Sequence, residues 1–93
     1  MATNFRISVH RNSDNLHLKL SGDFDGTSAH EVLNLLKRNC RGTSRVFIHT
    51  NALNHIHPFG QSVFRKNLGF LHGQPVVLSF TGEHSALLSP EEN

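Results

Sequence analysis

The stretch "LKLSGDFDGTSAHEV", residues 18–32, passes from a strand pattern into a helix pattern and decides the fold. In its first part, Leu18 and Leu20 alternate with polar residues, which is typical of a strand with one buried face. From its second part onward, apolar side chains recur at helical spacing, at Ala29, Val32, Leu33, Leu36 and Cys40. A strand that leads directly into an amphipathic helix indicates an α/β protein.

Acids and hydroxyl residues fill the junction between the two patterns. Asp23 and Asp25 are expected in a turn after the strand, because aspartate stabilises turns and is favourable near the positive end of a helix. Thr27 or Ser28 is expected to cap the helix, with Glu31 in its first turn. The junction therefore has a structural explanation before any function is assigned to it.

Outward from this stretch, period-2 and helical patterns alternate along the chain. Residues 5–11 and 16–20 surround a polar turn and predict a β-hairpin with one core face and one polar face. The other patterns predict a strand over 45–50, a helix over 58–73, a central or covered strand over 75–80, and one or two helical turns over 83–88. This order predicts a four-stranded mixed sheet with an antiparallel hairpin, parallel crossover strands and helices packed on one face. We expect a single domain over residues 1–93, with residues 88–93 as a frayed tail.

Composition narrows the class of protein. The chain has 93 residues and a net charge of +2, and its basic residues are dispersed, so no nucleic-acid partner is predicted. A single cysteine, Cys40, excludes an internal disulfide and agrees with a reducing compartment. No run approaches the roughly 20 apolar residues of a membrane helix. We therefore expect a cytoplasmic protein without membrane insertion, and no motif predicts a cofactor.

Two segments of the chain resemble the STAS domain, the family of anti-sigma-factor antagonists that also forms the cytoplasmic tail of sulphate transporters. In the stretch quoted above, the matching residues are Gly22, Asp23, Phe24, Asp25 and Ala29. The second segment, "RVFIHTNALNHIHPFGQSVF" over 45–64, is similar to the family's strand, short apolar loop and second helix, and it keeps Gly60. The resemblance covers roughly residues 5–88 and implies a STAS-like fold.

The resemblance also implies a function, and one residue departs from the family pattern. In the family, a serine or threonine that opens the second helix is phosphorylated by a partner kinase. Pro58 stands at that position here and cannot carry a phosphoryl group, although proline is well suited to open a helix. The chain thus resembles a non-enzymatic protein-interaction domain of bacterial signal transduction and transcription regulation, without the usual phosphorylation switch. The implied partner is an anti-sigma factor of the kinase-like type or a subunit of a larger complex.

The implied partner surface combines the opening of the second helix with the turn before the first helix. Its predicted members are Asp23, Asp25, Thr27, His55, His57, Pro58, Phe59 and Ser62. Phe59 either anchors a partner, since aromatic residues are enriched at binding hot spots, or packs inward beneath the helix, which is the favoured position. Ser62 is a candidate substitute phosphoacceptor, but an ordinary helical serine is favoured.

Other interpretations stay open beside this one. His55 and His57, with His49 nearby, form a candidate metal or small-ligand loop, although zinc needs at least three protein ligands. Alternatively, the chain is a structural subunit of a transport or regulatory complex, and two copies of the chain form a homodimer in one version of this interpretation. The polar face of the hairpin is mildly basic, and solvated surface is favoured there over a binding site for an acidic ligand. Its residues are Arg6, His10, His17 and Lys19.

Overall fold

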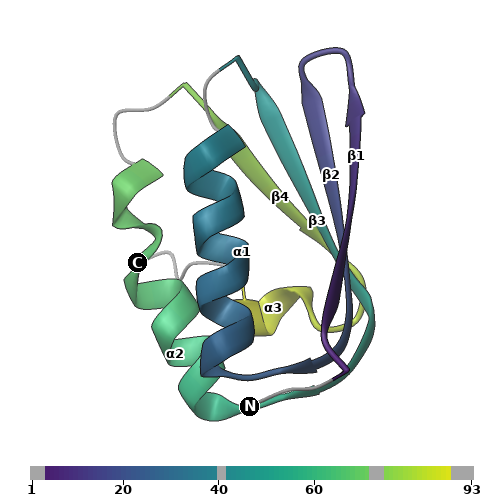
Figure 1. Ribbon diagram of the computed structural model, residues 1–93, viewed down its shortest axis with the longest axis vertical. Helices are drawn as coiled ribbons and strands as arrows, with labels where there is room; N and C mark the ends of the chain where they lie inside the picture. Colours follow the sequence, from purple (N-terminus) through teal and green to yellow (C-terminus); the bar gives the residue numbers. More distant parts are fainter. Residues whose placement is uncertain (1–3, 40–41, 72–74, 89–93) are drawn as a thin grey trace.

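The computed structural model describes residues 4–39, 42–71 and 75–88. Its elements are β1 (Arg6–Asn12), β2 (Asn15–Phe24), α1 (Gly26–Asn39), β3 (Arg45–Ile56), α2 (Pro58–Lys66), the 3-10 turn η1 (Leu68–Leu71), β4 (Val77–Thr81) and α3 (Ser85–Leu88). The four strands lie in the order β1-β2-β3-β4, with β1 antiparallel to β2 and the other pairs parallel. Figure 1 shows the helices gathered on one face of this sheet. The predicted mixed sheet with helices on one face is confirmed.

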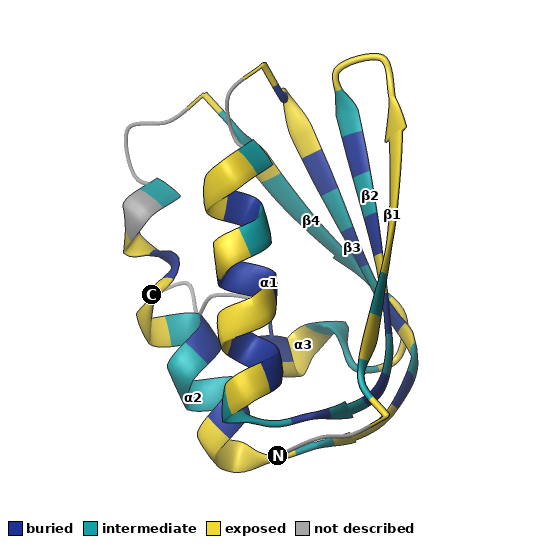
Figure 2. Cartoon of the chain, viewed as in Figure 1, coloured by how far each residue is buried: buried dark blue, intermediate teal, exposed yellow. Residues whose placement is uncertain are grey.

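The core lies between the sheet and the helices (Figure 2). The apolar side of β2 and the apolar stripe of α1 are buried, and they supply Leu16, Leu18, Leu20, Ala29, Val32, Leu33 and Leu36. Phe24 and Phe64 are fully buried and meet edge to face, with ring centroids 5.8 Å apart. Burial of these apolar surfaces is the main force that holds the two layers together.

Both outer strands are more exposed than the patterns suggest. Val9 on β1 is 51% exposed, although its register partner Leu18 is fully buried. The reason is that β1 is an edge strand and has a neighbour on one side alone. The strand predicted as central or covered is β4, which is the opposite edge, and Val77 is 53% exposed there. That prediction was wrong about the position of β4 in the sheet.

The two middle strands are longer than predicted. β2 continues to Phe24 and β3 continues to Ile56, so Asp23 and His55 lie in strands rather than in loops. The pairing of β2 with β3 shifts register between Lys19 and Ser21 and again between Gly22 and Asp23. These bulges let the backbone hydrogen bonds continue through a segment that has no period-2 pattern.

The second helical segment is shorter than predicted, because it divides at Asn67. The side chain of Asn67 donates a 2.7 Å hydrogen bond to the Val63 carbonyl, and its backbone φ of −103° leaves the helical region. α2 therefore ends at Lys66, and η1 follows it.

The helical turn predicted near the C-terminus is present as α3. The prediction of a frayed tail over 88–93 was wrong at Leu88, its first residue. α3 ends at Leu88, which is fully buried in the core. Cys40, residues 72–74 and the tail from 89 to 93 lie outside the described residues.

Candidate functional site

The site begins where β2 passes into α1, and Asp25 organises this junction. Its Oδ1 accepts a 2.9 Å hydrogen bond from the backbone N–H of Ser28 and a 3.0 Å bond from the Ser28 hydroxyl. Asp25 is therefore the N-cap of α1, which starts at Gly26. The predicted caps Thr27 and Ser28 were wrong, since both lie inside the first turn. Glu31 consequently falls beyond that turn.

The opening of α2 lies directly beside this junction. His57 is the N-cap with an extended backbone (φ −74°, ψ 138°), and Pro58 follows in the first turn of the helix. The N–H of His57 donates a 2.9 Å hydrogen bond to the Phe24 carbonyl, which ties the start of α2 to the end of β2. Proline fits this position because its fixed φ is helical and no backbone donor is lost there. The prediction that Pro58 opens the second helix is confirmed.

Gly60 allows the two segments to touch. A Cβ added at Gly60 would lie 2.6 Å from the carbonyl carbon of Asp25 and 2.7 Å from its oxygen. Gly60 itself is buried against that backbone. This contact explains why a glycine stands here, since any side chain would push α2 away from the β2–α1 junction.

Phe59 points outward from the same turn of α2. It is 72% exposed, so the favoured prediction that it packs inward was wrong. Its ring nevertheless rests near the start of α1, because a Cβ added at Gly26 would lie 2.8 Å from Cε2 of Phe59. The ring thus has one supported edge and a large apolar surface open to solvent.

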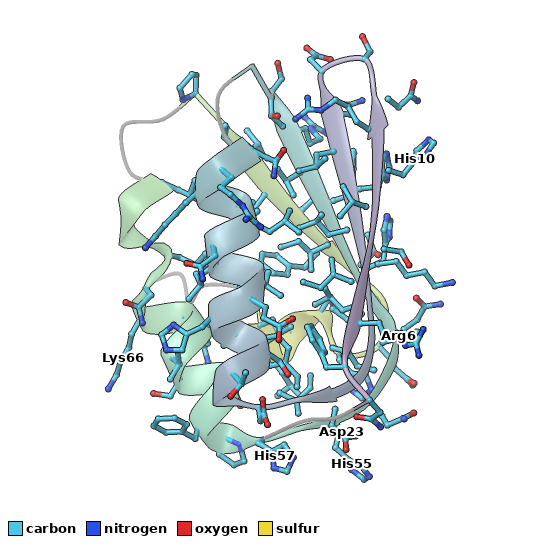
Figure 3. All side chains as sticks on the ribbon, in the orientation of Figure 1. Arg6, His10, Asp23, His55, His57 and Lys66 are labelled. Atoms are coloured by element: carbon cyan, nitrogen blue, oxygen red, sulfur yellow. The ribbon has the colours of Figure 1, made fainter. Side chains whose placement is uncertain are left out.

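Most of the predicted site residues gather at this end of the molecule. Asp23 and His55 are register partners on β2 and β3, and Figure 3 shows them close to His57. Thr27, His55 and His57 are exposed, whereas Asp23 and Asp25 are half-buried. Ser62 lies further along α2 and is also half-buried.

The candidate metal loop is not assembled in the part of the chain that the structure describes. No group of three or more histidine, cysteine, aspartate or glutamate side chains comes together there. His49 was expected near His55 and His57, but its side chain instead meets His17 and Thr81. The grouping of these three histidines was therefore wrong.

His49 belongs to a second polar cluster, with His17 and Thr81, that the sequence did not predict. Nδ1 of His17 lies 3.0 Å from Nε2 of His49, so one ring N–H donates to the unprotonated nitrogen of the other ring. Nδ1 of His49 lies 2.6 Å from the Thr81 hydroxyl. Burial lowers the pKa of His49, and the positive charges of His17 and Lys19 lower it further. His49 is therefore held neutral at pH 7.

Comparison with solved structures identifies the fold. The chain matches Mglu with a TM-score of 0.69 and 22% sequence identity, over 78% of this chain and 18% of the Mglu chain. It matches the anti-sigma factor antagonist SpoIIAA in its unphosphorylated form with a TM-score of 0.57 and 10% identity, over 80% of this chain and 70% of SpoIIAA. An uncharacterized DUF3478-family protein from Shewanella loihica PV-4 with a SpoIIAA-like fold matches with a TM-score of 0.54 and 21% identity, over 89% and 75% of the two chains. No protein-family model and no curated protein sequence matches the chain.

These matches confirm the predicted fold class: the chain has an α/β fold like that of SpoIIAA. It spans 18% of the length of Mglu, so the likeness concerns one part of that protein. The correspondence of Pro58 to a phosphoacceptor position stays a prediction. Within the described ranges, no helix has the length and apolar character needed to cross a bilayer.

Proposed function

We propose that this chain is a non-enzymatic protein-binding module whose partner docks at the opening of α2. The α2-opening surface consists of Asp23, Asp25, Thr27, His55, His57, Pro58, Phe59 and Ser62. The single observation that carries the proposal is the exposure of Phe59, whose side chain is 72% open to solvent. The SpoIIAA-like fold supports the proposal by analogy, because SpoIIAA is named as an antagonist of another protein.

Phe59 has the properties of an interface anchor. Aromatic side chains bury a large apolar area on binding and dominate the energy of many interfaces. The ring rests near Gly26 at the start of α1, so part of its freedom is already lost before a partner arrives. Such preorganisation strengthens binding, because less conformational entropy is lost in the complex.

Polar groups surround the anchor. His57, two residues before Phe59, and Thr27, in the first turn of α1, are exposed, and Asp23 and His55 lie at the same end of the sheet. An apolar centre with a polar rim is the usual anatomy of a protein interface. The surface therefore suits a protein partner with an apolar pocket and polar margins.

Binding at this surface would not be released by phosphorylation at residue 58. Phosphorylation adds close to two negative charges and three acceptor oxygens, and at a helix start it reorganises the local contacts. Pro58 has no hydroxyl to accept the group. The module would consequently bind constitutively, or under the control of its concentration or of a change elsewhere.

Site-specific photo-crosslinking tests the proposal. A photoreactive phenylalanine analogue at position 59 should join the chain to one defined protein in its native host. The same analogue at Leu87, an apolar residue of α3 that is 41% exposed, is the matched control. The same products from both positions, or none from position 59, would contradict a partner at the α2 opening.

A further inference from the structure

The open face of the sheet, the side away from the helices, carries a second set of side chains. Figure 3 shows Arg6 and His10 of β1 directed away from the helices. Strand register brings further members of the same face into line with them, because His10 pairs with His17, His17 with Phe47, Lys19 with His49, and His49 with Thr81. Arg45 lies two residues before Phe47 on the same side of β3. These residues form a continuous polar and aromatic patch across four strands.

The charge on this patch has one sign. Arg6, Lys19 and Arg45 are fixed cations, and no carboxylate of the described residues forms an ion pair with them. Asp23 lies near the end of β2, where it pairs with His55, and not beside the histidines of the patch. After β4, Glu83 approaches His84 at 4.0 Å. The patch therefore carries an excess of positive charge between Asp14 at one end, whose carboxylate accepts a hydrogen bond from Ser44, and Asp23 at the other end.

Two rings of the patch, those of His17 and Phe47, stack and cover one face of each other. Their planes lie within 14° of each other, and their centroids are 4.7 Å apart. This distance equals the spacing of neighbouring strands in a sheet. His10 lies on the other side of His17 at 6.3 Å, and the Arg45 guanidinium lies 5.9 Å from the Phe47 centroid. A nucleobase binds such a sheet by stacking on free ring faces. Here a partner meets ring edges and cationic N–H donors, which match carboxylate acceptors instead.

A hydrogen-bond chain makes this patch sensitive to protons. The two nitrogens of His17 and His49 approach to 3.0 Å, closer than the separation of about 3.5 Å between stacked carbon atoms, so the rings meet edge to edge. One proton lies between them, and the other nitrogen of His49 bonds to Thr81. If both rings were protonated, two N–H groups would face each other and this bond would be lost. His49 stays neutral at pH 7 because burial, His17 and Lys19 all lower its pKa.

We propose that the open face binds a carboxylate-rich surface of a protein partner, and that acidification strengthens this binding. Carboxylates next to the patch favour the protonated form of the histidines, so the complex takes up protons as it forms. By linkage, the affinity then rises as the pH falls. The groups that face His49 are His17 and Lys19 on β2 and Thr81 on β4. Arg45 and Phe47 on β3 and Arg6 and His10 on β1 lie farther along the same face. This surface is separate from the α2-opening surface and does not depend on it.

Binding of poly-L-aspartate, measured by fluorescence anisotropy at low salt, tests the proposal. We expect binding to be several-fold tighter at pH 6 than at pH 8, while the probe stays ionised at both. Lys19→Glu should weaken binding about tenfold. Lys66→Glu makes the same change in net charge, but on the helix side of the molecule, where Figure 3 shows Lys66. It should leave the affinity within about twofold of the wild-type value. The double variant His17→Gln/His49→Gln should remove most of the pH dependence, since His10 is then the one histidine left on the patch.

No binding of poly-L-aspartate at low salt, or equal losses for Lys19→Glu and Lys66→Glu, would overturn the proposal. A single-stranded oligouridylate of equal charge that binds more tightly, without dependence on pH, would indicate a nucleic-acid surface instead. Circular dichroism of each variant distinguishes a lost surface from a lost fold. The Phe59 tests concern another surface, so either proposal can fail alone.

Discussion

Gly60 of α2 lies against the backbone of Asp25, so close that a Cβ on Gly60 would lie 2.7 Å from the Asp25 carbonyl oxygen. This contact joins two segments that are far apart in the sequence, the β2–α1 junction and the opening of α2. Both segments supply residues of the α2-opening surface. The surface therefore depends on a backbone approach that glycine alone allows.

Gly60→Ala should destabilise the fold. The added methyl group meets backbone atoms that cannot move independently, so we expect a loss of about 1–3 kcal/mol in the free energy of unfolding. Urea denaturation measures this change. Gly69→Ala is the matched control, because nothing lies within 4 Å of the added Cβ there, and it should change stability by no more than about 1 kcal/mol. Equal effects of the two substitutions would show that the close approach at Gly60 does not exist.

Asp25→Ala should also destabilise the protein, through the loss of a helix cap. The N–H of Ser28 would lose its bond to Oδ1, and N-cap replacements by alanine cost about 1 kcal/mol. Asp25→Asn keeps an oxygen acceptor at the same place and should retain most of the stability. Thermal unfolding of the two variants beside the wild type makes the comparison, and an Asn variant as unstable as the Ala variant would indicate that the charge, rather than the cap, matters.

The lowered pKa of His49 predicts how stability depends on pH. In the unfolded chain, His49 titrates near pH 6.5, whereas in the folded chain it accepts a proton only at lower pH. The unfolded state thus binds more protons between these two values, so stability is full above about pH 6.5 and falls as the pH drops through the folded pKa. Urea midpoints at pH 8, 7, 6 and 5 should show this fall.

His49→Gln should weaken that dependence on pH, because the titrating group is gone. The control is His30→Gln, which replaces an exposed histidine of α1 and should leave the wild-type profile in place. If the profile of His49→Gln matches that of the wild type, the His17–His49–Thr81 chain does not govern the response to acid.

A phosphorylation assay tests the predicted loss of the switch. Incubation with ATP and a kinase of the anti-sigma-factor family should leave the wild-type chain without phosphate at the α2 opening, as measured by mass spectrometry. Pro58→Ser restores a hydroxyl in the first turn of α2 and should become a substrate. Phosphate on Ser62 or Thr27 of the wild type would instead reveal a displaced switch.

Local pattern was sufficient for some of the fold. The alternation of Leu16, Leu18 and Leu20 and the helical stripe from Ala29 to Leu36 each report which side of an element is buried, because burial acts on every second or every third to fourth residue. The hairpin, α1 and the parallel crossovers followed from these patterns. Pro58 also marked the start of α2 correctly, since its ring fixes a helical φ.

Other features depend on contacts that no local pattern contains. The segment from 51 to 56 does not alternate, and it is a strand because it pairs with β2 across two register shifts. Likewise, the meeting of His17 with His49 depends on the register of two parallel strands, which neither strand encodes alone. Phe59 fits a helical stripe, but it lies in the first turn of α2, beyond the core, and so it faces solvent.

The affinity of the Phe59→Ala variant for the partner identified by crosslinking tests the central claim most directly. Titration calorimetry with the purified partner should show a loss of at least about 2 kcal/mol, close to a 30-fold rise in Kd. Leu87→Ala, which removes an apolar side chain on α3, should leave the Kd within about twofold. A Kd that is unchanged by Phe59→Ala, with the variant still folded, would contradict the assignment of the α2 opening as the binding surface.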